Sequence, residues 1–588
     1  MPRLLTLLLC LFMFAACTEQ QASESKDQIA ENTAAKDTET ERTWWKEGIV
    51  YQIYPRSFKD TNGDGVGDLR GIIEKLDYIK SLGVDIVWLN PIYASPNDDN
   101  GYDISDYRAI MPEFGTMEDF NEMLAGMHER DIKLVMDLVV NHSSDEHEWF
   151  EQSRSSRDNP YRDYYHWWPA EKEKPNPRFS FFDVNNDAWM YDSTTNAYYL
   201  HYFSRKQPDL NWENPKVREE VKDIMRFWLD KGIDGFRMDA FQYVSKDTTF
   251  PKLPEGYEKD IIKYYGMGPN LHPYLKELNR DVLSEYDVMT VAEGAGSTYQ
   301  DAIDLVHPDS NELNMVYHFE GMDVGSSLDG YKLTEFKKVY SEWDSVLAGN
   351  GWNSIFLANH DQPRMVSKYG NDSPEFRAPS SKMLTTFILS MRGTPYYYYG
   401  DELGMTNNEA FQEIGDFQDI AARNSYEGAL ERGENMDNFM AHLRFMSRDN
   451  GRTPMQWNDT EHAGFTDGEP WLMLNPNYEQ INVEAQEDDP NSVLNYFRRM
   501  AQLRQENPVL VYGDYELLFP NHEQVYAYTR SLDGKEMLVM LNFSEEEVSV
   551  DLPLAQQPGD VVINNYENTR LEGSNVTLEP YQAVIWEI

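Results

Sequence analysis

Three acidic residues stand where short β-rich runs of the chain end. Asp239 follows the run GFRM, Glu293 follows VA, and Asp361 ends the run FLANHD. Carboxyl groups gathered in one pocket can donate a proton, accept one or attack an electrophile. A lone acidic residue at a strand end is usually a helix cap or an ion-pair partner, so catalysis requires elements that bring all three together.

The body of the chain alternates β-rich runs with amphipathic stretches and has no internal repeat. This alternation is typical of parallel β/α units, and eight such strands predict an α/β fold, the (β/α)8 TIM barrel. Reactive groups of such a barrel lie at the C-terminal ends of its strands, where the three acidic residues stand. The predicted strands are Ile49 to Tyr54, Asp85 to Leu89, Lys133 to Val139, Gly235 to Met238, Val288 to Ala292, Met315 to Phe319, Ser354 to Leu357 and Pro395 to Tyr399. The predicted helices include Leu69 to Leu82, Met117 to Arg130, Pro215 to Lys231, Tyr274 to Ser284 and Ser380 to Met391.

Two parts of the chain interrupt this pattern. Residues 143–212, after the third strand, are rich in Trp, Tyr, Pro, Asn and Asp and predict a small inserted domain beside the barrel mouth. Residues 509–588 alternate polar and apolar positions and predict a C-terminal antiparallel β-sandwich. The catalytic barrel is then formed by residues 44–142 and 213–508, with a second excursion near 407–477 over the same rim.

The N-terminus carries an export signal. A basic tip, an apolar run and FAAC at residues 14–17 predict a signal peptide, residues 1–17, with a lipobox that leaves Cys17 lipidated. Residues 18–43 are polar and predict a flexible tether. We therefore expect a bacterial cell-envelope protein, anchored by lipid and placed at the outer membrane because Thr18 follows Cys17; an ordinary signal peptide is the alternative.

The net charge of the chain is −49, far from neutral. Such a field repels phosphate backbones and anionic lipid headgroups, which argues against nucleic-acid binding and against membrane contact other than through the lipid anchor. Both cysteines, Cys10 and Cys17, lie in the signal segment, so no disulfide is expected in the folded body.

An Asp- and Gly-rich loop follows the first predicted strand. Carboxylate or amide oxygens alternate along it, and glycines permit a tight wrap, which suits a hard cation. The sequence predicts a structural Ca²⁺ site, with Mg²⁺ as an option; an Asx-rich turn without metal is the alternative. The predicted ligands are Asp60, Asn62, Asp64, Asp68 and the carbonyl of Val66.

Several motifs resemble the α-amylase family, glycoside hydrolase family 13, over nearly all of residues 44–588. They are DLVVNH at 137–142, GFRMDAF at 235–241, VAE at 291–293 and FLANHD at 356–361. QPDLN at 207–211 is similar to a marker of the oligo-1,6-glucosidase and α-glucosidase subgroup.

The resemblance implies a retaining glycosidase. Asp239 would be the nucleophile, Glu293 the acid/base and Asp361 the transition-state stabiliser, and Arg237 would keep Asp239 ionised. Direct attack by the nucleophile requires the Asp239 and Glu293 carboxyl groups to lie about 5–5.5 Å apart. Glu293 would need a raised pKa to hold its proton.

The resemblance also implies the residues that bind sugar. His142 and His360 would bond hydroxyl groups, Tyr102 would stack on a pyranose, and an Asp99–Arg448 pair would grip the terminal glucose and close the site. Phe203 and Gln207 complete the predicted substrate-binding residues.

A closed site implies an exo-acting α-glucosidase that takes short malto- or isomalto-oligosaccharides from the non-reducing end. Ala240, after the nucleophile, leaves α-1,4 and α-1,6 preference open. The alternatives are a hydrolase of trehalose or of a phosphorylated disaccharide, a transglycosylase, and, more remotely, a non-catalytic amylase-like scaffold.

Overall fold

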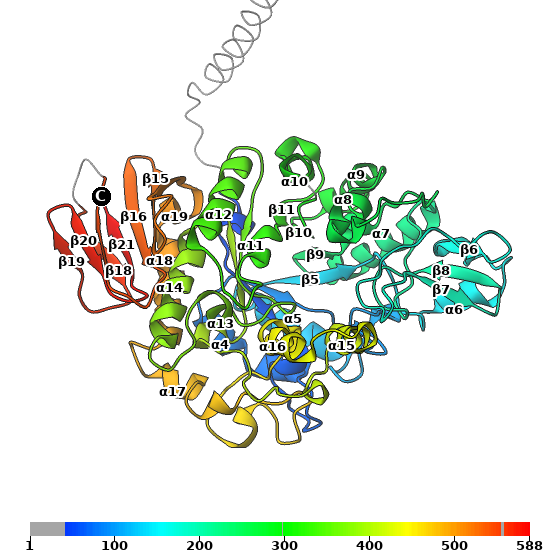
Figure 1. The fold of residues 1–588 in the computed structure, drawn as a ribbon, viewed down its shortest axis with the longest axis horizontal. Helices are drawn as coiled ribbons and strands as arrows, with labels where there is room; N and C mark the ends of the chain where they lie inside the picture. Colours follow the sequence, from blue (N-terminus) through cyan, green and yellow to red (C-terminus); the bar gives the residue numbers. More distant parts are fainter. Residues whose placement is uncertain (1–41, 297, 554–557) are drawn as a thin grey trace, which may run out of the picture. The chain divides into compact units, whose positions relative to one another are not determined.

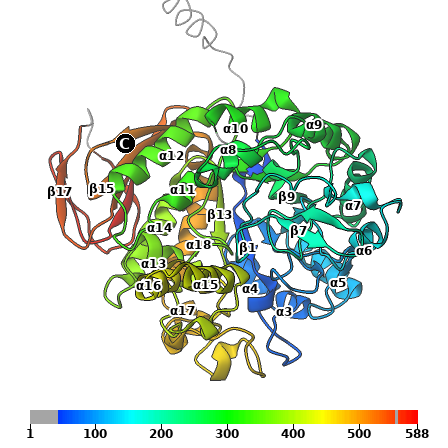
Figure 2. The same ribbon diagram turned by 45° about the vertical axis from the view of Figure 1, so that its right-hand side comes forward.

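A parallel eight-stranded sheet forms the centre of the molecule, with helices around it (Figures 1 and 2). Its strand order is β11-β10-β9-β5-β2-β1-β13-β12, and a parallel bridge between Val316 and Asn353 joins the two end strands, so the sheet closes. The predicted (β/α)8 barrel is therefore confirmed. The strands are β1 (Val50–Ile53), β2 (Ile86–Leu89), β5 (Lys133–Val139), β9 (Gly235–Asp239), β10 (Met289–Glu293), β11 (Met315–Tyr317), β12 (Ser354–Ile355) and β13 (Thr394–Tyr398).

The computed structural model describes residues 42–296, 298–553 and 558–588. The predicted signal peptide with Cys17, and all of the predicted tether except its last two residues, lie outside these ranges. Within them, no helix is both long and apolar enough to cross a membrane.

Local sequence sets where the helices around the barrel begin and end. Helix α5 starts at a capping box in which the Thr116 and Asp119 side chains each accept the other's backbone N–H. Helix α7 starts at Asn214, whose side chain caps it, followed by Pro215 in its first turn. The single helix predicted over Leu69 to Leu82 is wrong, because the chain leaves helical geometry at Lys75. The surrounding helices are α3 (Leu69–Glu74), α4 (Leu76–Ser81), α5 (Met117–His128), α7 (Pro215–Leu229), α9 (Leu271–Asp281), α10 (Tyr299–Val306), α12 (Leu333–Leu347), α14 (Arg377–Ser390) and α18 (Val493–Glu506).

The segment inserted after β5 forms its own small antiparallel sheet. Strands β6 (Trp167–Pro169), β8 (Ala197–Leu200) and β7 (Trp189–Asp192) pair in that order, beside helix α6 (Glu148–Ser155). Its aromatic residues explain the composition, since rings such as Phe150 and Trp167 stack in its interior. A bridge from Asp209 to His142 ties the end of the insertion to the end of β5.

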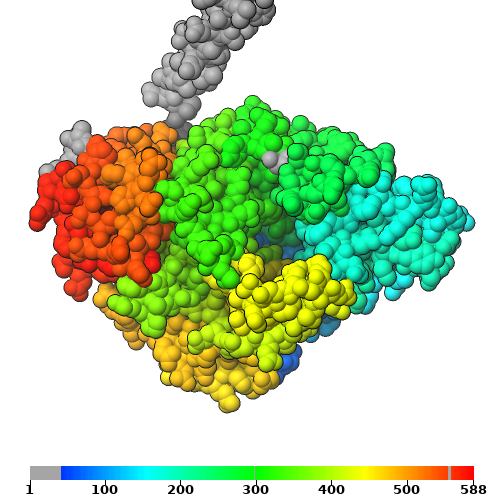
Figure 3. All heavy atoms as spheres, in the orientation of Figure 1, coloured from blue at the N-terminus to red at the C-terminus, as the bar shows by residue number. Residues whose placement is uncertain are grey.

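A second excursion follows β13 and contains helices α15 (Ile420–Arg432) and α16 (Met436–Met446). In the space-filling view this segment, in yellow, borders a recess together with the cyan inserted segment and the green part of the barrel (Figure 3). The excursion thus lies over the same rim as the insertion, as the sequence predicts.

The C-terminal part consists of two antiparallel sheets that share one apolar core. The larger contains β14 (Asp514–Leu518), β15 (Val525–Leu532), β16 (Lys535–Asn542), β21 (Ala583–Glu587) and β18 (Val561–Asn564), and the smaller contains β17 (Val548–Asp551), β20 (Asn575–Leu578) and β19 (Arg570–Glu572). The predicted sandwich is confirmed. The strands β18, β19 and β20 are short and lie among Asn, Glu and Gly. The exact domain boundaries stay a prediction.

One buried arginine of this C-terminal part, Arg530, reaches the barrel, where a second buried arginine, Arg504, binds the same segment. Arg504, on α18, donates to the carbonyls of Leu389 and Met391 at the end of α14 and to that of Gly393 before β13. Arg530, on β15, donates to carbonyls in the same region, including that of Ser390. Both side chains are fully buried, so these contacts satisfy backbone groups that water cannot reach.

Candidate active site

The three predicted acidic residues line one narrow cavity at the C-terminal ends of the strands. Asp239 ends β9 and Glu293 ends β10, and the parallel register places these two strand ends side by side. Asp361 follows β12, which only β11 separates from β10 in the closed sheet. The other residues lining the cavity are Asp99, Tyr102, His142, Phe182, Phe203, Ala240 and Arg448.

Arg237 links the two neighbouring carboxylates. Its Nη1 lies 2.5 Å from Asp239 Oδ1 and 3.1 Å from Asp137 Oδ1, while its Nη2 donates to Glu293 Oε1. The backbone N–H of Ala240, a residue with a left-handed φ of 45°, donates to Glu293 Oε2 at 2.7 Å. Both oxygens of Glu293 are therefore fixed relative to Asp239.

The glycine that begins GFRMD permits this strand pairing. A Cβ at Gly235 would lie 2.0 Å from the carbonyl oxygen of Met289, on the adjacent strand, and the φ of Gly235 is +156°. Only glycine allows β9 and β10 to approach this closely, which sets the spacing of the two carboxylates four residues on.

Burial and charge affect the three carboxyl groups differently. Burial raises the pKa of Asp239 and of Glu293, and the Arg237 guanidinium opposes both shifts. A pair of this kind can hold one proton near neutral pH while the other member stays ionised. Burial also opposes ionisation of Asp361, but its contacts with His360, Arg448 and Arg452 outweigh burial and lower its pKa.

Tyr102 and His360 form a stacked pair beside the cavity. Their rings lie 5.3 Å apart at 8°, and the Tyr102 hydroxyl lies 2.7 Å from His360 Nε2. The other ring nitrogen of His360 accepts from Gln52 at 2.9 Å, and burial lowers the pKa of His360 to about 3. His360 is therefore neutral and fixed at physiological pH, with one face of Tyr102 packed on it.

A second set of hydrogen bonds and ring contacts positions the remaining predicted residues at the cavity. Gln207 Nε2 donates to Asp99 Oδ2 and lies 3.1 Å from His142 Nε2. The Phe203 ring packs 5.0 Å from that of His142. The structure thus brings the QPDLN segment of the insertion onto the barrel mouth, and every predicted catalytic or substrate-binding residue lies in or directly behind the cavity.

Arg448 closes one end of the cavity. Its Nη2 lies 3.3 Å from Asp99 Oδ1, and its Nη1 lies 3.1 Å from Asp361 Oδ1. Asp419 holds the same guanidinium through Nε at 3.1 Å and through Nη2. Burial raises the pKa of Asp99 to about 7, and Arg448 opposes this shift. The Asp99–Arg448 pair is therefore a fixed wall, held from behind by Asp419.

Some residues of the site were not predicted. Asp419 holds Arg448, and Arg452 donates to Asp361 Oδ1 at 2.8 Å. Lys246, seven residues after Asp239, bonds Asn141 Oδ1 and pairs with Asp209 at 3.1 Å. Sequence offered only weak signals for these residues, since a single Asp, Arg or Lys in a loop is usually exposed.

The predicted cation loop is compact and hydrogen-bonded within itself. Asp60 accepts the backbone N–H groups of Asn62, Gly63 and Gly65, and Asp68 caps helix α3 through Gly71. Among the described residues, no group of three or more His, Cys, Asp or Glu side chains is arranged to hold a metal ion. The loop also offers amide and carbonyl oxygens, which are ligands of another kind. Asn62 Oδ1 and Asp64 Oδ1 each accept one backbone N–H, which leaves a lone pair on each for a cation.

Comparison with known proteins covers almost the whole folded body. Residues 52–513 match the family described as "Alpha amylase, catalytic domain", and residues 525–585 match "Alpha-amylase SusG C-terminal domain". An oligo-1,6-glucosidase of Parageobacillus thermoglucosidasius is 52% identical over 93% of this chain and 99% of its own length. A trehalose-6-phosphate hydrolase of Bacillus subtilis is 44% identical, with the same coverage. An isomaltulose synthase mutant from Erwinia rhapontici, solved with sucrose, superimposes with a TM-score of 0.91 at 45% identity, over 93% of this chain and all of that one.

Fold, converging carboxylates and sequence similarity lead to the same assignment. The chain belongs to the α-amylase family, glycoside hydrolase family 13, and is a glycoside hydrolase.

Proposed function

We propose that this enzyme is a retaining, exo-acting α-glucosidase that removes single glucose units from the non-reducing ends of short oligosaccharides with α-1,6 or α-1,4 bonds. The observation that carries the proposal is the Asp99–Arg448 wall, 3.3 Å between its charged atoms, directly beside the three carboxylates. A wall there leaves room for one ring on that side of the scissile bond. The curated relatives named oligo-1,6-glucosidase, at 48–52% identity, support α-1,6 bonds as one of the two linkages.

In the proposed reaction Asp239 attacks the anomeric carbon while Glu293 gives its proton to the glycosidic oxygen. The bond from carbon to the leaving sugar breaks, and a glycosyl-enzyme ester with Asp239 forms. Glu293, now ionised, takes a proton from water as the water attacks the same carbon and releases Asp239. Asp361, ionised, stabilises the positive charge of each transition state.

Substrate specificity tests the proposal directly. We expect initial rates on isomaltose and maltose to exceed those on trehalose, sucrose and soluble starch by at least about tenfold. Trehalose and sucrose have neither an α-1,4 nor an α-1,6 bond, and starch offers a closed cavity only its few chain ends. Release of α-glucose, followed by polarimetry or NMR, checks retention. Faster hydrolysis of starch than of either disaccharide would reject exo-action.

A phosphorylated disaccharide fits this cavity less well. The cavity wall contains four carboxylates and a single cation, Arg448, which the carboxylates already neutralise. The net charge of −49 adds to the repulsion of a phosphate. Trehalose 6-phosphate should therefore be a poorer substrate than isomaltose.

The raised pKa of Asp99 predicts that sugar binding depends on pH. Its pKa of about 7 means that it loses a proton as the pH rises from 6 to 8, and only the carboxylate accepts two sugar hydroxyls. The inhibition constant of glucose should therefore fall by about tenfold from pH 6 to pH 8. Asp99→Asn should bind glucose more weakly with no such trend, and a flat wild-type profile would contradict the assignment.

We also propose a structural cation in the loop of Asp60, Asn62, Asp64, Val66 and Asp68. The supporting observation is the lone pairs left on Asn62 Oδ1 and Asp64 Oδ1 at the exposed tip of the loop. Ca²⁺ suits such oxygen ligands, with Mg²⁺ as the alternative.

Chelation should lower the melting temperature by about 2–5 °C, because a cation that binds only the folded state stabilises it. Calorimetry with EDTA and then with added Ca²⁺ or Mg²⁺ checks this and identifies the ion. Asp64→Ala is the matched variant, since Asp64 accepts only one loop hydrogen bond; it should remove the response. An equal response in both proteins would place the ion elsewhere.

We further propose that Cys17 carries a lipid that anchors the enzyme in a bacterial cell envelope. The FAAC sequence supports this. Labelled palmitate should enter the wild-type protein and not Cys17→Ser, and equal labelling of both would reject the anchor.

A further inference from the structure

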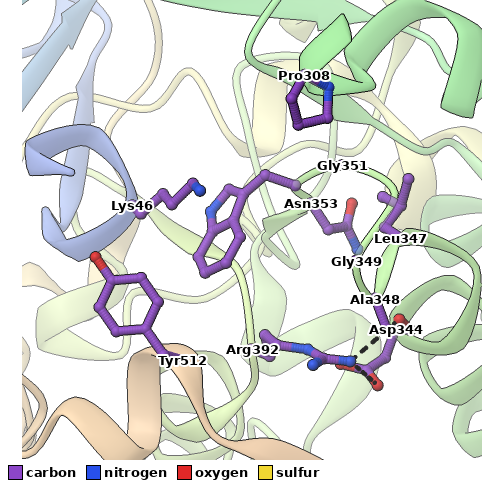
Figure 4. A pocket seen from close by; sticks show the side chains of 11 residues that line it. Lys46, Pro308, Asp344, Leu347, Ala348, Gly349, Gly351, Asn353, Arg392 and Tyr512 are labelled. Carbon is purple, nitrogen blue, oxygen red and sulfur yellow. Dashed lines mark hydrogen bonds and ion pairs between the residues drawn. The ribbon is translucent and has the colours of Figure 1, made fainter. Parts of the chain in front are cut away.

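Figure 4 shows the side chains that line a second cavity, of about 290 Å³. It lies at the end of the barrel opposite the catalytic carboxylates. Its walls come from residues that precede strands: Lys46, on helix α2 (Trp44–Glu47), precedes β1, Asn353 precedes β12 and Arg392 precedes β13. The C-terminal end of α12 and Tyr512, on α19 (Pro508–Tyr512), complete it. Because the proposed chemistry occurs where the strands end, this cavity is separate from the active site.

Asn353 gives the cavity a polar group that needs a partner. The residue is only 5% exposed, and its Oδ1 has no hydrogen-bond partner among the residues that the structure describes. Its backbone carbonyl accepts from Thr394, so the main chain is fixed. Figure 4 shows the amide beside the Gly349–Gly351 turn. Buried amides are rarely left without a partner, so this one points to a ligand or an ordered water in the cavity.

Two of the three charges facing the cavity form an ion pair, and the third, Lys46, packs on an aromatic ring. Arg392 donates to both oxygens of Asp344, from Nε and Nη2, at 2.8 Å each (Figure 4). The Lys46 ammonium lies 5.1 Å from the centre of the Trp352 ring. This wall therefore offers donors and acceptors together without a large net charge, which suits a neutral ligand with several hydroxyl groups.

An aromatic wall stands beside these polar groups. The Trp352 indole N–H already donates to Thr394 Oγ1 at 2.9 Å, and the Tyr512 ring lies 5.9 Å from the Trp352 ring. Leu347 lines the cavity as well. Aromatic surfaces next to amide and ion-paired groups match the apolar and hydroxyl-bearing faces of a pyranose.

We propose that this cavity is a non-catalytic binding site for a single neutral sugar ring such as glucose. The volume, near the lower end of the range for small-molecule pockets, favours one ring over a chain. Asn353 would accept a hydrogen bond from one sugar hydroxyl, and Asp344 and Arg392 would form hydrogen bonds with the neighbouring hydroxyls of the same ring. The proposal that this cavity binds a sugar follows from these contacts alone. The choice of glucose, as the product of the enzyme, rests on the proposed function.

Hydrogen–deuterium exchange of the intact protein tests the site with glucose as the probe. Glucose should slow exchange in the segment 347–353 by about threefold or more in the wild type. The effect should vanish in Asn353→Ala and in Ala348→Trp, which fills the cavity and keeps Asn353. Ser345→Ala, at an exposed position of helix α12, is the control and should behave as wild type. All three variants should hydrolyse substrate at the wild-type rate.

Glucose at the active site should slow exchange in segments around Asp239 and Asp361 in every variant, so the two sites are read separately. Wild-type exchange at 347–353 that glucose leaves unchanged would overturn the proposal, even if the active site responds. Protection by inorganic phosphate and not by glucose would also overturn it, since the occupant would then be an anion held by Lys46. Loss of the effect in Ala348→Trp despite intact Asn353 would support occupancy of the cavity itself.

Discussion

Asp239→Asn should lower kcat on isomaltose by at least about 10⁴-fold while the protein stays folded. The amide is nearly isosteric with the carboxylate but cannot form the glycosyl-enzyme ester. Arg237 keeps two other partners, Asp137 and Glu293, so the buried guanidinium remains paired. Steady-state kinetics measure the effect, and circular dichroism checks the fold. Asp247→Asn, exposed in the loop after β9, is the matched control and should keep full activity.

A second substrate separates the roles of the two carboxylates. Glu293→Gln should release a rapid burst of nitrophenol from a nitrophenyl glucoside, because that leaving group needs no proton, and should then turn over slowly, because water attack still lacks its base. Asp239→Asn should give no burst, because every substrate needs the nucleophile. A burst from both variants, or wild-type turnover by Asp239→Asn, would refute the assignment of Asp239.

Asp99→Ala should lower kcat/KM on isomaltose by about 10²–10³-fold, equal to about 3–4 kcal/mol. The change removes a buried carboxylate that would bond the terminal glucose and opens the wall beside it. Arg448 stays paired with Asp419 and Asp361, so we expect little loss of stability.

The same variant should change the relative rates on long and short substrates. Activity on soluble starch should fall much less than activity on isomaltose, because an opened wall admits further sugar units. Asp106→Ala, an exposed acidic residue on strand β4 (Asp106–Ile110), is the control. Equal losses on both substrates would reject the closed-end explanation of exo-action.

The sequence alone predicted the barrel and its carboxylates well. Buried parallel strands appear in the sequence as short apolar runs. An acidic residue directly after such a run must lie at the C-terminal rim of the barrel. Lys133–Val139 was predicted with its exact bounds. Asp239 and Glu293 were placed just beyond their strands, whereas in the structure they are the last strand residues.

The supporting residues could not be predicted from local pattern. Asp419 acts through Arg448, which is 29 positions away and joined to it only by the fold of the second excursion. Lys246 and Asp209 meet because the insertion returns to the barrel, and nothing in either neighbourhood indicates the other. Contacts between loops depend on how the rim segments close over each other, and a periodic pattern carries no information about that.

The buried Arg530 side chain, which reaches from β15 to the last residue of α14, makes the C-terminal sheets part of the barrel's own hydrogen bonding. A protein truncated before Arg530 would leave the Ser390 carbonyl sealed in an apolar interior with one donor fewer. Barrel and sandwich should therefore melt together in one calorimetric peak, and the sandwich cannot be exchanged for an unrelated module without supplying an equivalent cation.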